Sequence, residues 1–218
     1  MYIQTDSFES NKIASLLEQI DIRNEPLAVQ PFLGKIQNKA ELIQVYKDLD
    51  GQHDQISRLA SLSLIHCFDL DAYVLFEPNF FFNKYRLVTL RSDLYDQMNI
   101  HFDLLKYKSY CRSKEQNALK AGLAKQIWSD PTAKDLFGAS EEAGYFGGNG
   151  SNGWKLIALT NFALDVFMHE QGLKLIRLSP YDTLMVNGRL HSLKELLLSS
   201  DPNVNEKVQQ FLKRQLIN

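Results

Sequence analysis

The segment Arg86–Tyr110 reads RLVTLRSDLYDQMNIHFDLLKYKSY, and the segment Lys155–Tyr181 reads KLIALTNFALDVFMHEQGLKLIRLSPY. The two segments align along their length when a two-residue insertion is allowed in the second, and Asp96 then falls opposite Asp165. Each segment reads as a strand, a short capped helix and a second strand, because short apolar runs flank a more polar stretch. The alignment therefore predicts a structural duplication of units 86–110 and 155–181, whose strands join one mixed sheet around a local pseudo-twofold.

Apolar periodicity, caps and breaking residues predict the other elements of the chain. They are helices over 7–22, 39–49, 53–67, 113–128, 131–137, 193–198 and from 202 onward, an extended connector or edge strand over 27–33, a strand over 72–76, and a hairpin around Asn187-Gly188. These elements predict an α+β or α/β fold with a helical N-terminal third and a C-terminal helix. The helices between residues 113 and 137 form an insertion between the two copies. No flexible linker divides the sequence, so residues 1–218 are expected to form a single domain, with a mainly helical portion over 1–70 and an α/β core over 71–218.

The composition favours a protein of the cytoplasm that binds neither nucleic acid nor membrane. A formal net charge of −2 and a pI near 6.2 argue against a partner held by phosphate contacts. The first residues, MYIQTDSFESNK, lack the basic and apolar regions of a signal peptide, and no apolar run reaches the roughly 20 residues of a membrane helix. Cys67 and Cys111 do not have metal-binding spacing and are expected to be reduced, buried thiols.

One segment differs in composition from the rest of the chain: Gly144–Gly153, GYFGGNGSNG, holds five of the eleven glycines. It is expected to be a loop with several left-handed backbone positions. A phosphate-binding interpretation is disfavoured, because the segment has no GK[ST] ending and no GxGxxG, and because it is expected to lead into a strand at Trp154. The alternative is a mobile recognition loop. Tyr145, Phe146 and Trp154 are then the candidate partner-binding residues, and a purely structural role, in which these aromatics fix the loop ends in the core, stays open.

Other patterns typical of chemistry are weak in this sequence. The histidines lack HxxxH or HExxH spacing, and Asp69 and Asp71 after His66 do not satisfy the ligand count of zinc or calcium, so neither a metal nor a cofactor is expected. Glu141 and Glu142 are adjacent carboxylates beside the glycine-rich loop. They read more readily as a charged loop entry than as an acid–base pair.

The strand–helix–strand unit with a Ser/Thr-capped helix resembles units in immunity proteins of bacterial toxin systems, a resemblance too general to carry any residue across. The sequence favours a non-catalytic cytosolic protein-binding domain, most concretely an inhibitor or immunity-type protein. The alternative is a small hydrolase or transferase, with a site where Gly144–Gly153 meets Glu141, Glu142 and a histidine of the second copy. Whether the chain is an enzyme, and its oligomeric state, stay open.

Overall fold

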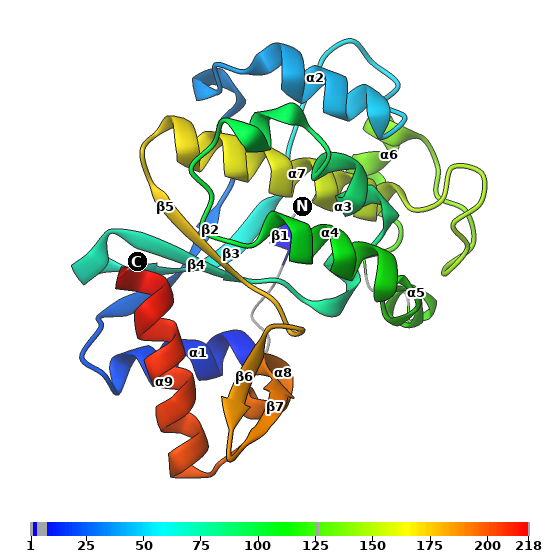
Figure 1. Ribbon diagram of the computed structural model, residues 1–218. Helices are drawn as coiled ribbons and strands as arrows, with labels where there is room; N and C mark the ends of the chain where they lie inside the picture. Colours follow the sequence, from blue (N-terminus) through cyan, green and yellow to red (C-terminus); the bar gives the residue numbers. More distant parts are fainter. Residues whose placement is uncertain (1, 4–7, 125–126, 218) are drawn as a thin grey trace. The chain divides into compact units, whose positions relative to one another are not determined.

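The computed structural model describes residues 2–3, 8–124 and 127–217. Helices and a mixed sheet are both present in these ranges, which confirms the predicted α+β class (Figure 1). Among the described helices, none is long and apolar enough to cross a membrane.

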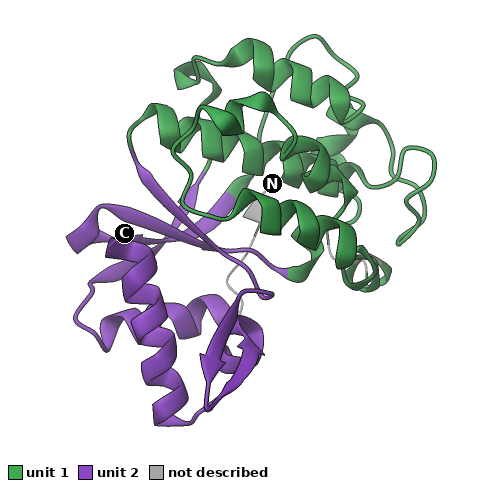
Figure 2. Cartoon of the chain, in the orientation of Figure 1, with its two compact units in different colours: residues 1–2, 30–61, 79–172 green, residues 3–29, 62–78, 173–218 purple. Residues whose placement is uncertain are grey.

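The chain forms two compact units that are interleaved in sequence (Figure 2). Unit 1 comprises residues 1–2, 30–61 and 79–172, and unit 2 comprises residues 3–29, 62–78 and 173–218. Neither unit is continuous in the sequence, since the chain passes from one to the other after residues 2, 29, 61, 78 and 172. The single domain expected from the sequence stays a prediction.

The sheet has the order β2-β3-β4-β5, and β1 (Tyr2–Ile3) also belongs to it. Strand β3 (Ser61–Cys67) is antiparallel to both of its neighbours, β2 (Asn24–Val29) and β4 (Ala72–Phe76), whereas β5 (Lys174–Leu178) runs parallel to β4. Parallel neighbours need a long crossover connection. Here the crossover consists of residues 77–173, which contain most of unit 1.

The core of unit 2 lies between one face of this sheet and three helices, α1 (Phe8–Glu18), α8 (Leu193–Leu197) and α9 (Pro202–Ile217). Alternate residues of the central strands point to this face, as the pleat requires. They include Ile65, Cys67, Ala72, Val74, Phe76, Ile176 and Leu178, which pack with Ile13, Leu16, Leu17, Leu193, Leu197, Val208 and Leu212 of the helices. A two-stranded hairpin, β6 (Thr183–Val186) and β7 (Arg189–Ser192), adds Leu184 and Val186 to the same core.

In its described residues, unit 1 is built mainly from helices. They are α2 (Lys39–Asp48), α3 (Lys84–Thr89), α4 (Leu104–Ser113), α5 (Glu115–Leu123), α6 (Pro131–Phe137) and α7 (Asn152–Glu170), with short 3-10 turns η1 (Leu33–Lys35), η3 (Asn79–Phe81) and η4 (Asp93–Asp96); a further turn, η2 (Phe68–Leu70), lies in unit 2. Helix α7 is buried along nearly its whole length. Helices α2, α3 and α6 all contact it, so α7 is the central element of the unit.

The predicted duplication is wrong. Residues 86–110 contain no strand and fold as α3, η4 and the first turns of α4, whereas the second segment is the long helix α7 followed by β5. The strand expected at residues 155–159 is wrong because α7 is buried on nearly all sides. A helix buried on every face loses the 3.6-residue period, and a short apolar run then looks like a strand.

In the N-terminal third the error is the opposite one: a strand was predicted to be a helix. The helix expected over 53–67 is wrong: residues 53–60 form neither a helix nor a strand, and 61–67 are the strand β3. Since β2 is a strand as well, residues 1–70 are not mainly helical. Strand β3 pairs on both edges and is almost wholly buried. The spacing of Ile56, Leu59, Ala60 and Ser63 also fits one face of a helix, and this pattern favoured the wrong element. The expected C-terminal helix is confirmed as α9.

Candidate functional site

The glycine-rich segment forms a loop between α6 and α7 whose base is closed by hydrogen bonds. The Glu141 amide donates to the carbonyl of Gly150 at 2.7 Å, and the Asn149 amide donates to the Glu141 carboxylate at 3.0 Å. The Asn149 side chain donates to the carbonyls of Phe137 and Ala139 at 2.8 and 2.5 Å. Because the two ends of the loop bind each other, its backbone is held in place before any partner arrives.

Glycine is required where the loop returns to the helix. Gly150 has a φ of +61°, and a Cβ there would stand 1.9 Å from the Tyr85 hydroxyl oxygen. That hydroxyl accepts a hydrogen bond from the amide of Ser151 at 2.9 Å. Burial raises the pKa of Tyr85 to about 12, so the phenol stays neutral at ordinary pH.

A buried lysine fixes the same end of the loop. Lys155, in the second turn of α7, is 1% exposed. Its ammonium donates to the Asp50 carboxylate at 2.8 Å and to the Asn149 side-chain oxygen at 2.9 Å. Asp50 is 76% exposed in its side chain, so this ion pair connects the interior of the unit to its surface.

A second lysine holds the middle of the loop. The ammonium of Lys84 donates to the Phe146 carbonyl at 2.6 Å and lies 5.1 Å from the centroid of the Tyr85 ring. Burial, and to a smaller extent the charge of Lys155, lower the pKa of Lys84. Lys84 and Lys155 therefore bind loop atoms from two different helices, which is a structural role.

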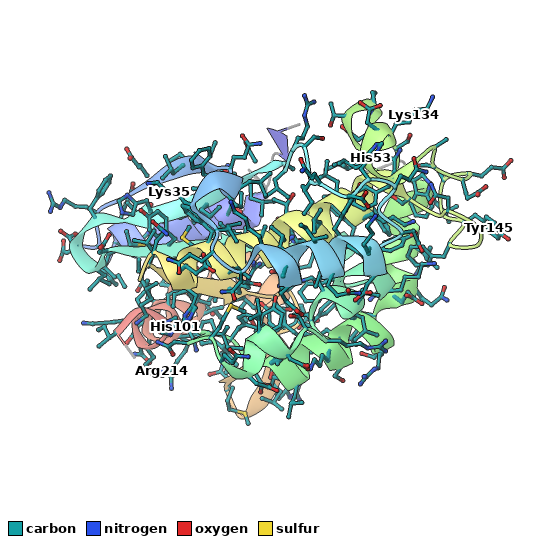
Figure 3. The ribbon with its side chains drawn as sticks, turned by 90° about the horizontal axis from the view of Figure 1, so that it is seen from above. Lys35, His53, His101, Lys134, Tyr145 and Arg214 are labelled. Carbon is teal, nitrogen blue, oxygen red and sulfur yellow. The ribbon has the colours of Figure 1, made fainter. Side chains whose placement is uncertain are left out.

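The three predicted partner-binding residues differ in how deeply their side chains are buried. Trp154 is 1% exposed and packs against Trp128 with ring centroids 4.9 Å apart. Phe146 is half-buried and contacts Trp128, Trp154 and Tyr85. Tyr145 is 59% exposed at the outer end of the loop (Figure 3), where its ring lies against Gly147. Phe146 and Trp154 thus hold the loop, and Tyr145 is the aromatic that it presents.

A second exposed apolar side chain lies against Gly144, the residue before Tyr145. Leu123, at the end of α5, is 66% exposed, and a Cβ on Gly144 would stand 2.6 Å from its Cδ2. The Leu123 side chain thus lies against the residue that precedes Tyr145 in the chain. We call Leu123, Gly144 and Tyr145 the loop patch.

The loop leads into a helix, which corrects the expected strand at Trp154 and removes one argument against phosphate binding. The helix N-terminus is nevertheless already occupied. The amide of Asn152 donates to Ser140 Oγ at 2.9 Å, that of Gly153 to the Trp128 carbonyl at 3.4 Å, and that of Trp154 to Ser151 Oγ at 3.0 Å. The amides that would bind a phosphate at a helix N-terminus are thus already bonded to protein atoms.

The groups considered for an enzymatic site are not brought together. The only histidine of the second segment, His169, lies 17 residues beyond Asn152 in the same helix, about 25 Å along its axis. Glu141 and Glu142 are both exposed at the loop. Within the described residues there is no group of three metal-ligating side chains, and Asp69 is bound by Arg23 through its amide and its guanidinium.

Sequence reasoning missed Lys84, Tyr85, Leu123 and Lys155. For Lys155 there was a signal: it is a lone charge inside the apolar run Trp154–Leu159, and such a charge needs a partner if the run is buried. For Leu123 and Tyr85 the sequence gives no such signal.

The fold and the site together define an α+β protein with a firmly held loop that presents an exposed apolar patch. The chain belongs to a family of unknown function, DUF7255, whose model matches residues 44–199. Comparison with curated proteins found no match, and neither did comparison with solved structures.

Proposed function

We propose that this protein is a non-catalytic protein-binding domain of the cytoplasm, and that it contacts its partner through the loop patch. An inhibitor or immunity-type protein of a bacterial toxin system is the most concrete form of this function. The observation that carries the proposal is the contrast between Tyr145, which is 59% exposed, and the closed, hydrogen-bonded base of the loop on which it stands.

A firmly held loop supports binding because ordering a mobile loop reduces affinity. Here the hydrogen bonds from Lys84, Asn149 and Lys155 already hold the loop in the free protein. Tyrosine is among the residue types that dominate interface energies, since it offers a large rigid ring with a polar end. The neighbouring Leu123 extends the apolar area.

The charges around the patch support a protein partner. Glu141 and Glu142 are exposed at the loop, and the Asp50 carboxylate is exposed nearby on the Lys155 ion pair. Carboxylates repel a phosphate backbone, so they disfavour nucleic acid at this surface. They complement a partner with an apolar pocket and basic residues around it.

The two cysteines support a reducing compartment. Cys67 lies in unit 2 and Cys111 in unit 1, and both are buried free thiols. A cytoplasmic location is consistent with this state.

The test is affinity capture from an extract of the native source, followed by direct measurement of binding to the captured protein. Tyr145→Ala should weaken binding by about 2 kcal/mol or more, about thirtyfold in Kd, as truncating an interface hot spot does. Leu123→Ala should weaken it less. Phe32→Ala is the matched control, because Phe32 is also in unit 1 and is 62% exposed but lies outside the loop patch.

Two results would contradict the proposal. In the first, Tyr145→Ala and Phe32→Ala bind the captured partner as tightly as the wild-type protein. In the second, the protein turns over a substrate in the extract and Tyr145→Ala leaves that activity intact.

A further inference from the structure

A groove of about 700 Å³ lies in unit 2 between strand β6 and helix α9. One wall is formed by Thr183, Leu184 and Met185 of β6. The other wall is formed by α9, where Lys207, Phe211 and Arg214 follow one another at i, i+4 and i+7. This spacing places the three side chains on one face of the helix, over a length of about 10 Å.

The β6 wall of the groove is an open strand edge. Within the described chain, β6 pairs only with β7, and the two strands are joined by the two-residue turn Asn187-Gly188. Such a turn bonds its flanking residues to each other, here Val186 and Arg189, and bonded pairs then alternate along the ribbon. The amides and carbonyls of Thr183 and Met185 therefore point away from β7, toward the outer edge of β6.

The α9 wall is positively charged and is not neutralised. Lys207, Lys213 and Arg214 line the groove together with Gln210, and no acidic side chain lines it. In the described chain these three cations form no ion pair; Lys207 and Arg214 bond only to the side chain and the carbonyl of Gln210. Arg214 is labelled in Figure 3, where its side chain extends from α9.

The groove also carries apolar surface. Met185 is 59% exposed, and the residue opposite it on β7, Leu190, is 66% exposed. Phe211 is half-buried on the α9 wall. The groove thus combines an unpaired strand edge, apolar side chains and a row of positive charges.

We propose that this groove binds an extended acidic peptide segment of a partner protein, which adds to β6 as a third strand. The backbone of the segment exchanges hydrogen bonds with Thr183 and Met185, and strand addition of this kind is a recurring mode of peptide recognition. Its acidic side chains lie against Lys207, Lys213 and Arg214, and an apolar side chain packs on Met185 or Phe211. Four extended residues span about 13 Å, close to the length of the basic face of α9.

A second copy of the chain is a poorer occupant. An antiparallel pairing of two β6 edges would bring the cations of two α9 helices toward each other, and like charges across an interface oppose association. A polyanion such as single-stranded nucleic acid satisfies the charges, but it makes no use of the strand edge.

The probe is a fluorescent heptapeptide in which glutamate and valine alternate, acetylated and amidated at its ends. It should bind at least tenfold more tightly than the same peptide with lysine in place of glutamate, and its affinity should fall with added salt. Methylating alternate peptide nitrogens gives two further probes. One set of nitrogens faces β6, so one methylated peptide should lose at least tenfold in affinity while the other binds nearly as well as the parent.

Charge-reversal variants test whether the acidic peptide binds in the groove. Lys213→Glu combined with Arg214→Glu should weaken binding of the acidic peptide at least tenfold. Lys12→Glu is the matched control, since Lys12 is a lysine of α1 in the same unit and outside the groove; it should change the affinity less than twofold. Tyr145→Ala should leave peptide binding unchanged, which separates this inference from the function proposed for the loop patch. Circular dichroism checks that each variant is folded.

Four results would overturn the inference. The first is equal binding of the acidic and basic peptides, and the second is equal binding of the two methylated peptides. The third is tighter binding of a ten-residue oligo(dT) than of the acidic peptide. The fourth is a dimer, seen in sedimentation, that Lys213→Glu combined with Arg214→Glu makes more stable. The third would assign the groove to nucleic acid, and the fourth to a second copy of the chain.

Discussion

Arg86 and Asp165 form a buried ion pair inside unit 1, with Nη2 of the arginine 3.2 Å from Oδ2 of the aspartate. The Tyr95 hydroxyl donates to the same carboxylate oxygen at 2.6 Å, and the other arm of the guanidinium donates to Thr89 Oγ1 at 3.2 Å. These bonds join α3 and η4 to α7, the central helix of the unit. Removing one member leaves the other charge in a low-dielectric interior without its counter-ion.

Asp165→Leu alone should therefore lower the free energy of unfolding by about 3–5 kcal/mol. Adding Arg86→Met to the same protein should recover much of this loss, because two apolar side chains of similar volume replace the pair without leaving a charge. Urea denaturation of the wild type, both single variants and the double variant measures the coupling. A double variant as unstable as the sum of the two singles would show that the pair is not coupled.

Replacing Trp154 by alanine should lower the free energy of unfolding much more than replacing Tyr145 by alanine does. Trp154→Ala should lower the free energy of unfolding by about 3–5 kcal/mol, because it empties space among Trp128, Phe146 and Phe80. Tyr145→Ala should change it by no more than about 0.5 kcal/mol, as exposed substitutions usually do. Thermal melting of both variants checks this; an equal loss in both would mean that Tyr145 also supports the fold.

Gly153 lies in the first turn of α7, and a Cβ there would stand 2.0 Å from the carbonyl oxygen of Ile127. Gly→Ala within a helix normally stabilises by about 0.5–1 kcal/mol. Gly153→Ala should instead destabilise the protein, because backbone atoms cannot move aside as a flexible side chain can. The control is Gly172→Ala, where φ is +68° but no atom lies within 4 Å, so only the backbone cost of about 1–2 kcal/mol applies. Denaturant midpoints should rank Gly153→Ala as the less stable of the two.

Burial raises the pKa of the Cys67 thiol from its ordinary value of 9.0 to about 11, with a smaller contribution from Asp69. The folded state thus holds this proton more tightly than the unfolded state does. The resulting stabilisation is complete below pH 9 and is lost as the pH rises through 11. Between pH 8.5 and 10.5 the free energy of unfolding of the wild type should therefore fall by about 2 kcal/mol more than that of Cys67→Ala. This follows because a shift of one pKa unit corresponds to about 1.4 kcal/mol. Parallel alkaline profiles for the two proteins would contradict this.

Thiol titration should find Cys67 and Cys111 unreactive in the native protein and both reactive in denaturant. The reason is that Cys67 is fully buried and Cys111 is 1% exposed. Rapid reaction of either thiol under native conditions would show that its surroundings open on the timescale of the reagent.

The sequence predicted best where local chemistry decides the structure. Strand β4, the Asn187-Gly188 hairpin and the starts of α6 and α9 after Asp130 and Asp201 all lie where caps and turn residues place them. It failed in α7, where burial on nearly all sides removes the periodic pattern, and in β3, where the apolar residues also fit the spacing of a helix face. In both elements the long-range contacts, and not the local residue order, decide between helix and strand.

The candidate site was predicted in part. The glycine-rich segment is a loop, and Tyr145 is exposed at its end. The sequence could not separate Tyr145 from Trp154, because both are aromatic residues at an end of the glycine-rich segment and only packing decides which one is buried. It also could not bring Leu123 to Gly144 or Asp50 to Lys155, since those pairs are distant along the chain.

The parallel pairing of β4 with β5 has a consequence for synthesis. Residues 77–173, 97 residues in all, separate the end of β4 from the start of β5. At a translation rate of about 5–20 residues per second, the ribosome needs roughly 5–20 s to make this stretch. During that time a strand that is buried in the finished protein has one edge without a partner. Nascent chains of this protein should therefore depend on chaperones for that interval, more than their modest size alone would suggest.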